Sequence, residues 1–178
     1  MNHIGIDIET RSSADIGKTG LYRYALDPDF SILLFAYKTP DSDVKVVDLA
    51  QGEKIPDEVI RILQDPGWIK HAYNAAFEWF CLNTAGLNTP LSQWQCTMIQ
   101  SMYCGYPASL DASGKALGLP QDKRKLSAGK ALIRYFCVPC RPTKANGGRH
   151  WNLPKHDPDK WELFKTYNGQ DVGTEQEI

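Results

Sequence analysis

Near its N-terminus the chain reads Ile4-Gly5-Ile6-Asp7-Ile8-Glu9. The alternation of apolar residues predicts a strand with one face against a core. Residues two apart on a strand project from the same face, so the carboxylates of Asp7 and Glu9 are expected side by side. Neighbouring acids in an apolar strand repel each other and lose solvation unless a cation joins them, and Mg²⁺ takes carboxylate oxygens. The pair therefore predicts a metal site; the alternative is a strand end where water solvates both acids.

Strand and helix patterns alternate along the rest of the chain. Further strands are predicted over 31–37, 45–47, 68–73 and 94–97. Helices are predicted over 57–64, 75–84, 97–103, 109–117 and 127–136, and again from Pro158 through Asp171. A turn at 40–43 makes the first strands antiparallel neighbours. The stretch 138–158 contains four prolines and a Gly-Gly pair, and it is predicted to be a long loop of functional or mobile character.

The composition is that of one globular domain. The chain has 178 residues, of which 42% are hydrophobic and 23% charged. Its longest apolar run, 32–37, is far below the ~20 residues that span a bilayer. The first strand begins by about residue 4, which leaves no room for a signal peptide. Five irregularly spaced cysteines indicate reduced thiols and a cytoplasmic protein.

Positive charge is concentrated late in the chain, although the net charge is −1. A basic patch is the expected footprint of phosphate contact, whereas the alternative is a solvated helix face and loop. An acidic pocket that holds cations can still bind nucleic acid, because the metals reverse the local sign. The basic residues of this stretch are Lys123, Arg124, Lys125, Lys130, Arg134, Arg141, Lys144, Arg149 and Lys155.

Two later segments contain further acids that could join the predicted metal site. Glu78 lies where a strand passes into a helix, in Asn74-Ala75-Ala76-Phe77-Glu78, so it is expected at the rim of the sheet. Its alternative is a surface glutamate favoured by the helix dipole. Tyr167 and Asp171 are four apart on the last predicted helix, which places the phenol over the carboxylate. The alternative there is an interfacial tyrosine with an exposed aspartate.

In this order, the three segments resemble the motifs of the DEDD exonuclease superfamily, in the branch with tyrosine in its last motif. Asp7 and Glu9 match the first motif, 74–78 the second and 167–171 the third. Outside the motifs, 20–25, 32–37 and 109–119 are similar to exonuclease domains of phage-type family A DNA polymerases. The second motif usually ends in aspartate, where this chain has Glu78.

The resemblance implies an α/β, ribonuclease H-like fold with a mixed five-stranded sheet and helices on both sides. It implies a 3′→5′ exonuclease that releases nucleoside monophosphates from single-stranded or frayed DNA 3′ ends with two Mg²⁺ or Mn²⁺ ions. In that scheme Asp7 bridges both ions, Glu9 and Asp171 complete the nucleophile side, and Glu78 serves the leaving-group side through water. Tyr167 orients the attacking water.

The resemblance also implies a larger context. Residues 1–178 are expected to form one exonuclease domain, and the final helix lacks a closing glycine before Ile178, which suggests a fragment of a longer polypeptide. The expected partners are a single-stranded DNA 3′ end and a polymerase domain in cis. The chain is expected to act as a monomer, without membrane association, in the host cell cytoplasm if a phage encodes it.

Three other interpretations compete with this one. A ribonuclease D-like exoribonuclease shares the tyrosine branch, and the metal chemistry does not separate RNA from DNA. A non-catalytic nucleic-acid-binding domain could keep the fold. A structural zinc site is possible at Cys137, Cys140, His150 and His156, although the gap between cysteines and histidines is short for a zinc finger. No G-x-G-x-x-G or phosphate-loop motif supports a nucleotide-binding doubly wound fold.

Overall fold

The computed structural model describes residues 2–124, 126 and 128–178. Its centre is one five-stranded sheet in the order β3-β2-β1-β4-β5. The strands are β1 (Asn2–Arg11), β2 (Ser31–Lys38), β3 (Lys45–Asp48), β4 (Trp68–Ala72) and β5 (Trp94–Cys96). The pairs β1–β2 and β2–β3 are antiparallel, while β1–β4 and β4–β5 are parallel. The predicted mixed sheet, with antiparallel first strands, is confirmed.

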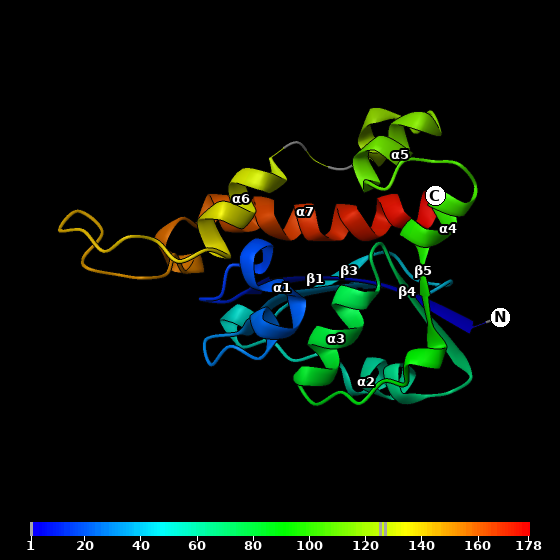
Figure 1. Ribbon diagram of the computed structural model, residues 1–178, viewed down its shortest axis with the longest axis horizontal. Coiled ribbons are helices and arrows are strands. Elements are labelled where there is room, and N and C mark those ends of the chain that lie inside the picture. The colour runs from blue at the N-terminus through cyan, green and yellow to red at the C-terminus, as the bar shows by residue number, and fades with distance from the viewer. Residues whose placement is uncertain (1, 125, 127) are drawn as a thin grey trace.

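Helices cover both faces of the sheet, as predicted. Figure 1 shows α7 running along one face, with α5 and α6 on that side, and α2 and α3 on the other face. The helices are α1 (Ile16–Ala25), α2 (Asp57–Gln64), α3 (Ala76–Thr84), α4 (Thr97–Tyr103), α5 (Leu110–Ala116), α6 (Gly129–Phe136) and α7 (Pro158–Glu177). Single 3₁₀ turns occupy Leu49–Gln51, Leu91–Gln93, Gln121–Lys123 and Pro154–His156. The start predicted for α6, at Ser127, lies outside the described residues.

The alternation in β1 divides the core into two clusters. Ile4, Ile6 and Ile8 are buried in a cluster with α2 and α3. A second cluster joins β2 to α6 and α7 through aromatic residues, including Phe136 and Trp161, whose rings meet edge to face at 4.8 Å. Since successive residues of a strand face opposite ways, Asp7 and Glu9 are left facing the side of α7. Burial of the apolar face of β1 therefore determines the direction in which its acidic face points.

Helix α1 was not predicted from the sequence. Asp15 caps it by accepting a hydrogen bond from the Gly17 N–H, but Gly20 interrupts it with a φ of +77°. Two glycines within ten residues weaken the helical pattern, and the left-handed conformation of Gly20 divides the segment into two short pieces. Tertiary contact with α3 compensates for the weak local preference.

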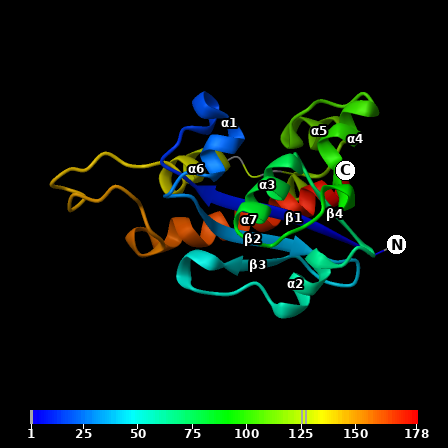
Figure 2. The same ribbon diagram turned by 60° about the horizontal axis from the view of Figure 1, so that its bottom comes forward.

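The predicted long loop is confirmed between α6 and α7. It contains the short 3₁₀ turn at Pro154–His156 and otherwise has no regular structure. Figures 1 and 2 show it extending well away from the body of the domain in both views. Among the described residues, no helix has the length and apolar character to cross a membrane.

Candidate active site

All five residues predicted to form the site line one pocket of about 710 Å³. Asp7 and Glu9 come from β1, Glu78 from the first turn of α3, and Tyr167 and Asp171 from α7. A neighbouring pocket of about 820 Å³ between α5 and α6 shares Asp7, Tyr167 and Asp171. The fold therefore brings together side chains that are more than 160 positions apart in the sequence.

A buried amide holds Asp7 in place. The Nδ2 of Asn168 donates hydrogen bonds to Oδ2 of Asp7 at 2.6 Å and to the Asp7 carbonyl oxygen at 3.2 Å. Asn168 is 0% exposed, and its hydrogen bonds connect Asp7 of β1 to α7. The sequence interpretation missed this residue; its spacing of three from Asp171, which places both on one face of a helix, was the available signal.

Glu78 is buried in the pocket, so the alternative of a surface glutamate is wrong. Asn74 turns the chain from β4 into α3 with a φ of +77°, a left-handed conformation that asparagine tolerates. The first turn of α3 then points Glu78 inward, where it is 3% exposed. Its Oε2 is buried and has no hydrogen-bond partner among the described residues. A buried carboxylate oxygen without a donor is costly, which indicates a ligand from outside the protein.

The acids of the pocket oppose one another's ionisation. Burial raises the pKa of the Glu78 carboxyl well above its ordinary value of 4.5, and the Asp7 carboxylate and then Glu9 raise it further. Like charges in a site of low polarity favour the protonated form of the most buried acid. A cation among these groups would reverse the effect, because it stabilises every carboxylate at once.

Tyr167 is held rigidly beside the acids. Its ring is 2% exposed and lies parallel to Phe164, with centroids 6.1 Å apart. Gly129, at the start of α6, makes room for it: a Cβ built on that glycine would stand 2.2 Å from Cε2 of the tyrosine ring. Burial first, and then the charge of Asp171, raises the pKa of the Tyr167 phenol. The phenol therefore stays protonated and can act as a hydrogen-bond donor.

The donor chemistry of the pocket fits hard divalent cations. In the described part of the chain, no three His, Cys, Asp or Glu side chains converge as a formed metal-binding group. The four carboxylates line one pocket. Carboxylate oxygens are nevertheless the ligands that Mg²⁺ and Mn²⁺ prefer, and the Oε2 of Glu78 lacks a protein partner among the described residues.

The structure gives no support to the zinc alternative. Cys137 is buried at the end of α6, while Sγ of Cys140 lies 3.4 Å from the carbonyl oxygen of Arg149. The Nδ1 of His156 accepts a hydrogen bond from the Leu153 N–H. Together with His150 these residues belong to the described chain, in which no such metal group is found.

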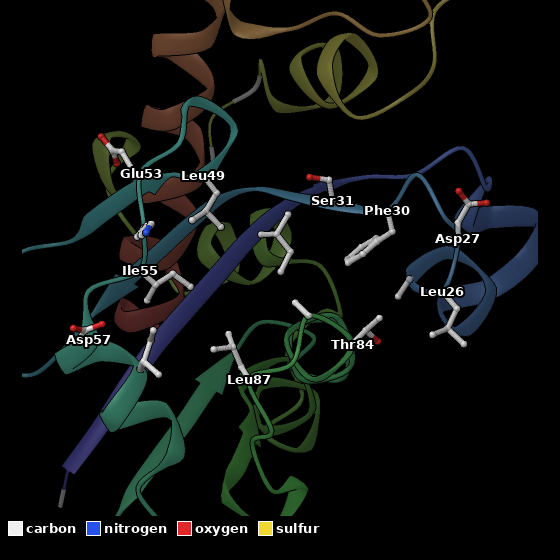
Figure 3. Close-up of a pocket in the computed structure, with 15 residues that line it drawn as sticks. Leu26, Asp27, Phe30, Ser31, Leu49, Glu53, Ile55, Asp57, Thr84 and Leu87 are labelled. Carbon is white, nitrogen blue, oxygen red and sulfur yellow. The ribbon is translucent and has the colours of Figure 1, made fainter.

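Another pocket of about 710 Å³ lies on the opposite face of the sheet, between α1, α2 and α3. Figure 3 shows its apolar lining, which includes Phe30 and Leu87. The carboxylates of Asp27, Glu53 and Asp57 point to separate places around it. Because its acids do not gather, this pocket does not offer the chemistry of the acidic pocket.

The sequence is similar over its whole length to part of a phage DNA polymerase. The DNA polymerase of Bacillus phage SP02 is 53% identical over 180 residues, which cover all of this chain and 27% of that protein. The chain thus spans about a quarter of the length of this relative. No protein-family model matches the chain.

Solved nuclease and polymerase structures share the fold. The family B DNA polymerase of Pyrobaculum calidifontis has a TM-score of 0.52 at 19% identity, covering 99% of this chain and 24% of that one. Brucella melitensis NrnC with bound Mg²⁺ has a TM-score of 0.50 at 15% identity, covering 98% and 84%. At such identities the likeness shows the fold. This fold confirms the predicted ribonuclease H-like sheet, and the phage relative agrees with the predicted similarity to phage DNA polymerases.

Proposed function

We propose that this chain is a metal-dependent 3′→5′ exonuclease acting on single-stranded or frayed DNA 3′ ends. The observation that carries the proposal is the meeting of Asp7, Glu9, Glu78, Tyr167 and Asp171 in one pocket. The relationship to a phage DNA polymerase supports DNA as the substrate. It also supports a polymerase domain in the same polypeptide, for which this domain would remove misincorporated nucleotides in the host cytoplasm.

The carboxylates of Asp7, Glu9, Glu78 and Asp171 would hold two Mg²⁺ or Mn²⁺ ions, and the Mg²⁺ bound to NrnC, which has the same fold, supports this choice. Such ions lower the pKa of water and stabilise the charge that develops on the phosphoryl and leaving oxygens. Asn168 fixes the orientation of Asp7 by its hydrogen bond at 2.6 Å. Glu78 reaches the site with one methylene more than the usual aspartate, and its burial keeps that longer side chain inside the pocket.

The phenol of Tyr167 would donate a hydrogen bond to the attacking water or to the scissile phosphate. Burial, together with the charge of Asp171, raises the pKa of this phenol, which makes it a poor general base near neutral pH. Stacking on Phe164 and the absence of a side chain at Gly129 determine where the hydroxyl can lie. Orientation by a fixed donor is the contribution expected from a group that cannot take up the proton.

The test uses single-stranded DNA labelled at its 5′ end, with a matched RNA as the second substrate. We expect the DNA to shorten from its 3′ end in one-nucleotide steps with Mg²⁺ or Mn²⁺, and to stay intact with a chelator. Asp7→Asn should reduce the rate by about three orders of magnitude or more, because metal ligation contributes several kcal/mol to transition-state stabilisation.

Asp159→Asn is a matched control, since Asp159 is an exposed acid in the first turn of α7. Its cleavage rate should equal that of the unmodified chain, and a thermal melt should show that both variants are folded. Undiminished cleavage by Asp7→Asn would reject the assignment of the pocket. Preference for the RNA would favour the exoribonuclease interpretation, and no cleavage of either strand would favour a non-catalytic binding domain.

A further inference from the structure

The loop between α6 and α7 has an extreme charge distribution. We call residues 137–156 the basic arm. It contains no Asp or Glu and carries the four cations Arg141, Lys144, Arg149 and Lys155, in a chain whose net charge is −1. No ion pair found among the described residues involves any of these four. A run of cations without acids is unfavourable by itself and becomes favourable beside a polyanion.

The basic arm has a defined conformation despite its lack of helix or strand. The Cys140 N–H donates to the His150 carbonyl oxygen at 2.7 Å, which closes the loop at its base. At its tip the Asn146 side chain donates to the Arg141 carbonyl oxygen at 2.9 Å and accepts from the Thr143 and Gly148 N–H groups. The arm therefore presents its cations in a fixed arrangement, so binding requires little further ordering of the backbone.

The base of the basic arm belongs to the acidic pocket. Cys137, Val138 and Pro139 line that pocket together with the carboxylates. On its returning side, the Trp151 ring lies 5.1 Å from the guanidinium carbon of Arg11, two residues beyond Glu9 on β1. Both sides of the arm are thus attached near the acids, and its tip extends away from them (Figures 1 and 2).

We propose that the basic arm binds the phosphodiester backbone of the DNA strand whose 3′ end occupies the acidic pocket. The inference rests on the proposed function, which places a 3′ end in the pocket and leaves the 5′ part of the strand to pass outward. Arg141, Lys144 and Lys155 are exposed and contact the phosphates. Such contacts hold the strand without reading its sequence. The arm sets how strongly affinity depends on strand length.

The test compares binding and cleavage of oligo-dT of three and twelve nucleotides, each with a 5′ fluorophore. The variant Arg141→Gln/Lys144→Gln/Lys155→Gln removes three exposed cations. Arg149 is kept, because its guanidinium bonds to Asn152 Oδ1 and the Asn146 carbonyl oxygen help to fix the arm. The matched control is Lys45→Gln/Lys54→Gln/Arg61→Gln, which removes the same charge from exposed positions around β3 and α2.

Binding of the twelve-nucleotide strand is measured by anisotropy in a chelator, over a range of salt concentrations. In the arm variant we expect affinity to fall by about tenfold or more, and the slope of log K against log salt to become smaller in magnitude by about 2, since each phosphate contact on a single strand contributes about 0.7. With Mg²⁺, kcat/KM should fall for the twelve-nucleotide strand and stay unchanged for the three-nucleotide strand. The control should leave all of these values unchanged.

An unchanged salt slope in the arm variant would overturn the proposal. Equal losses for both strand lengths would overturn it too, because they would place the effect in the pocket, and equal losses in the control would attribute it to net charge alone. Failure of the proposed function has a different signature. A chain that binds through the arm but never cleaves would refute the nuclease assignment only, and a cleaving chain with arm-independent binding would refute the arm only.

Discussion

Helix α7 carries two buried acids one turn apart, and their surroundings differ completely. Asp171 and Glu175 are both 4% exposed. Glu175 accepts hydrogen bonds from the Thr97 hydroxyl and from Nδ1 of His71, the latter at 2.8 Å. The other ring nitrogen of His71 lies 3.1 Å from Nδ1 of His3. Asp171 instead lines the pocket that contains three more carboxylates.

The comparison separates two uses of a buried carboxylate. The protein itself supplies polar partners to Glu175, so this acid fastens the end of α7 to β4 and α4. In the acidic pocket, burial first and then the neighbouring carboxylates of Asp7 and Glu9 raise the pKa of Glu78, so ionisation of this acid is disfavoured. A cation bound among these carboxylates would offset that effect. Burial alone therefore does not identify a functional acid, whereas the chemistry of its neighbours does.

The largest expected effect is a difference between these two acids: neutralising Asp171 should lower the cleavage rate, whereas neutralising Glu175 should lower the free energy of unfolding. Asp171→Asn should lower the cleavage rate by about three orders of magnitude, because it removes a metal ligand. It should leave the free energy of unfolding within about 1 kcal/mol of the unmodified chain, or raise it, since it removes a repelling charge. Glu175→Gln should cost about 1–3 kcal/mol, because the Thr97 hydroxyl and the half-buried His71 ring lose their carboxylate acceptor. Its cleavage rate per folded molecule should change only a few-fold.

Urea unfolding in a chelator and single-turnover cleavage measure the two quantities separately. Thr97→Val is a useful companion, because it removes one donor to Glu175 without touching the acidic pocket. It should destabilise less than Glu175→Gln and leave cleavage unchanged. If Glu175→Gln lost as much activity as Asp171→Asn at temperatures where both are folded, the division between the two acids would be wrong.

The sequence predicted the acidic pocket better than the cluster around Glu175. Alternation in β1 and the ordered motifs located Asp7, Glu9, Glu78, Tyr167 and Asp171, all of which the fold brings to one pocket. The contact between His71 and Glu175 joins residues 104 positions apart, and no local sequence pattern predicts it. Helix α1 was missed because Gly20 disrupts its periodicity.

The supporting residues of the pocket were missed for a similar reason. Asn168 and Gly129 matter through what they touch, namely the Asp7 carboxylate and the Tyr167 ring. Neither an amide nor a glycine carries a chemical signature of its own. Long-range contacts of this kind come from packing, which a single sequence does not display.

A smaller effect concerns the pH dependence of stability without metal. The folded pKa of Glu78 is raised above its ordinary value of 4.5, so the folded state binds a proton more tightly than the unfolded state does. The contribution to stability is full below the unfolded pKa and is lost as pH rises through the folded pKa. In a chelator, the melting temperature should therefore fall as pH rises from 5 to 8, and Glu78→Gln should reduce that fall.

Added Mg²⁺ should restore stability most at the upper end of this range, because the carboxylates are then deprotonated and can bind it. The same titration on Glu175→Gln is the comparison, since that acid lies outside the pocket. A decline with pH that Glu78→Gln leaves unaltered would show that the pocket acids do not repel one another as their positions indicate.

The smallest effect is expected at Tyr167, whose contribution is a single hydrogen bond from a protonated phenol. Tyr167→Phe should lower kcat by up to about tenfold, the value of one such bond, and should leave the shape of the pH–rate profile unchanged because the phenol does not titrate in the working range.

Gly129→Ala should cause a similar loss with the phenol still present, because the added methyl displaces the ring. If both act through the position of one hydroxyl, Gly129→Ala should cost nothing further in a chain that already carries Tyr167→Phe. Additive losses in the double variant would mean that Gly129 affects cleavage independently of the Tyr167 hydroxyl, for example by supporting the carboxylates.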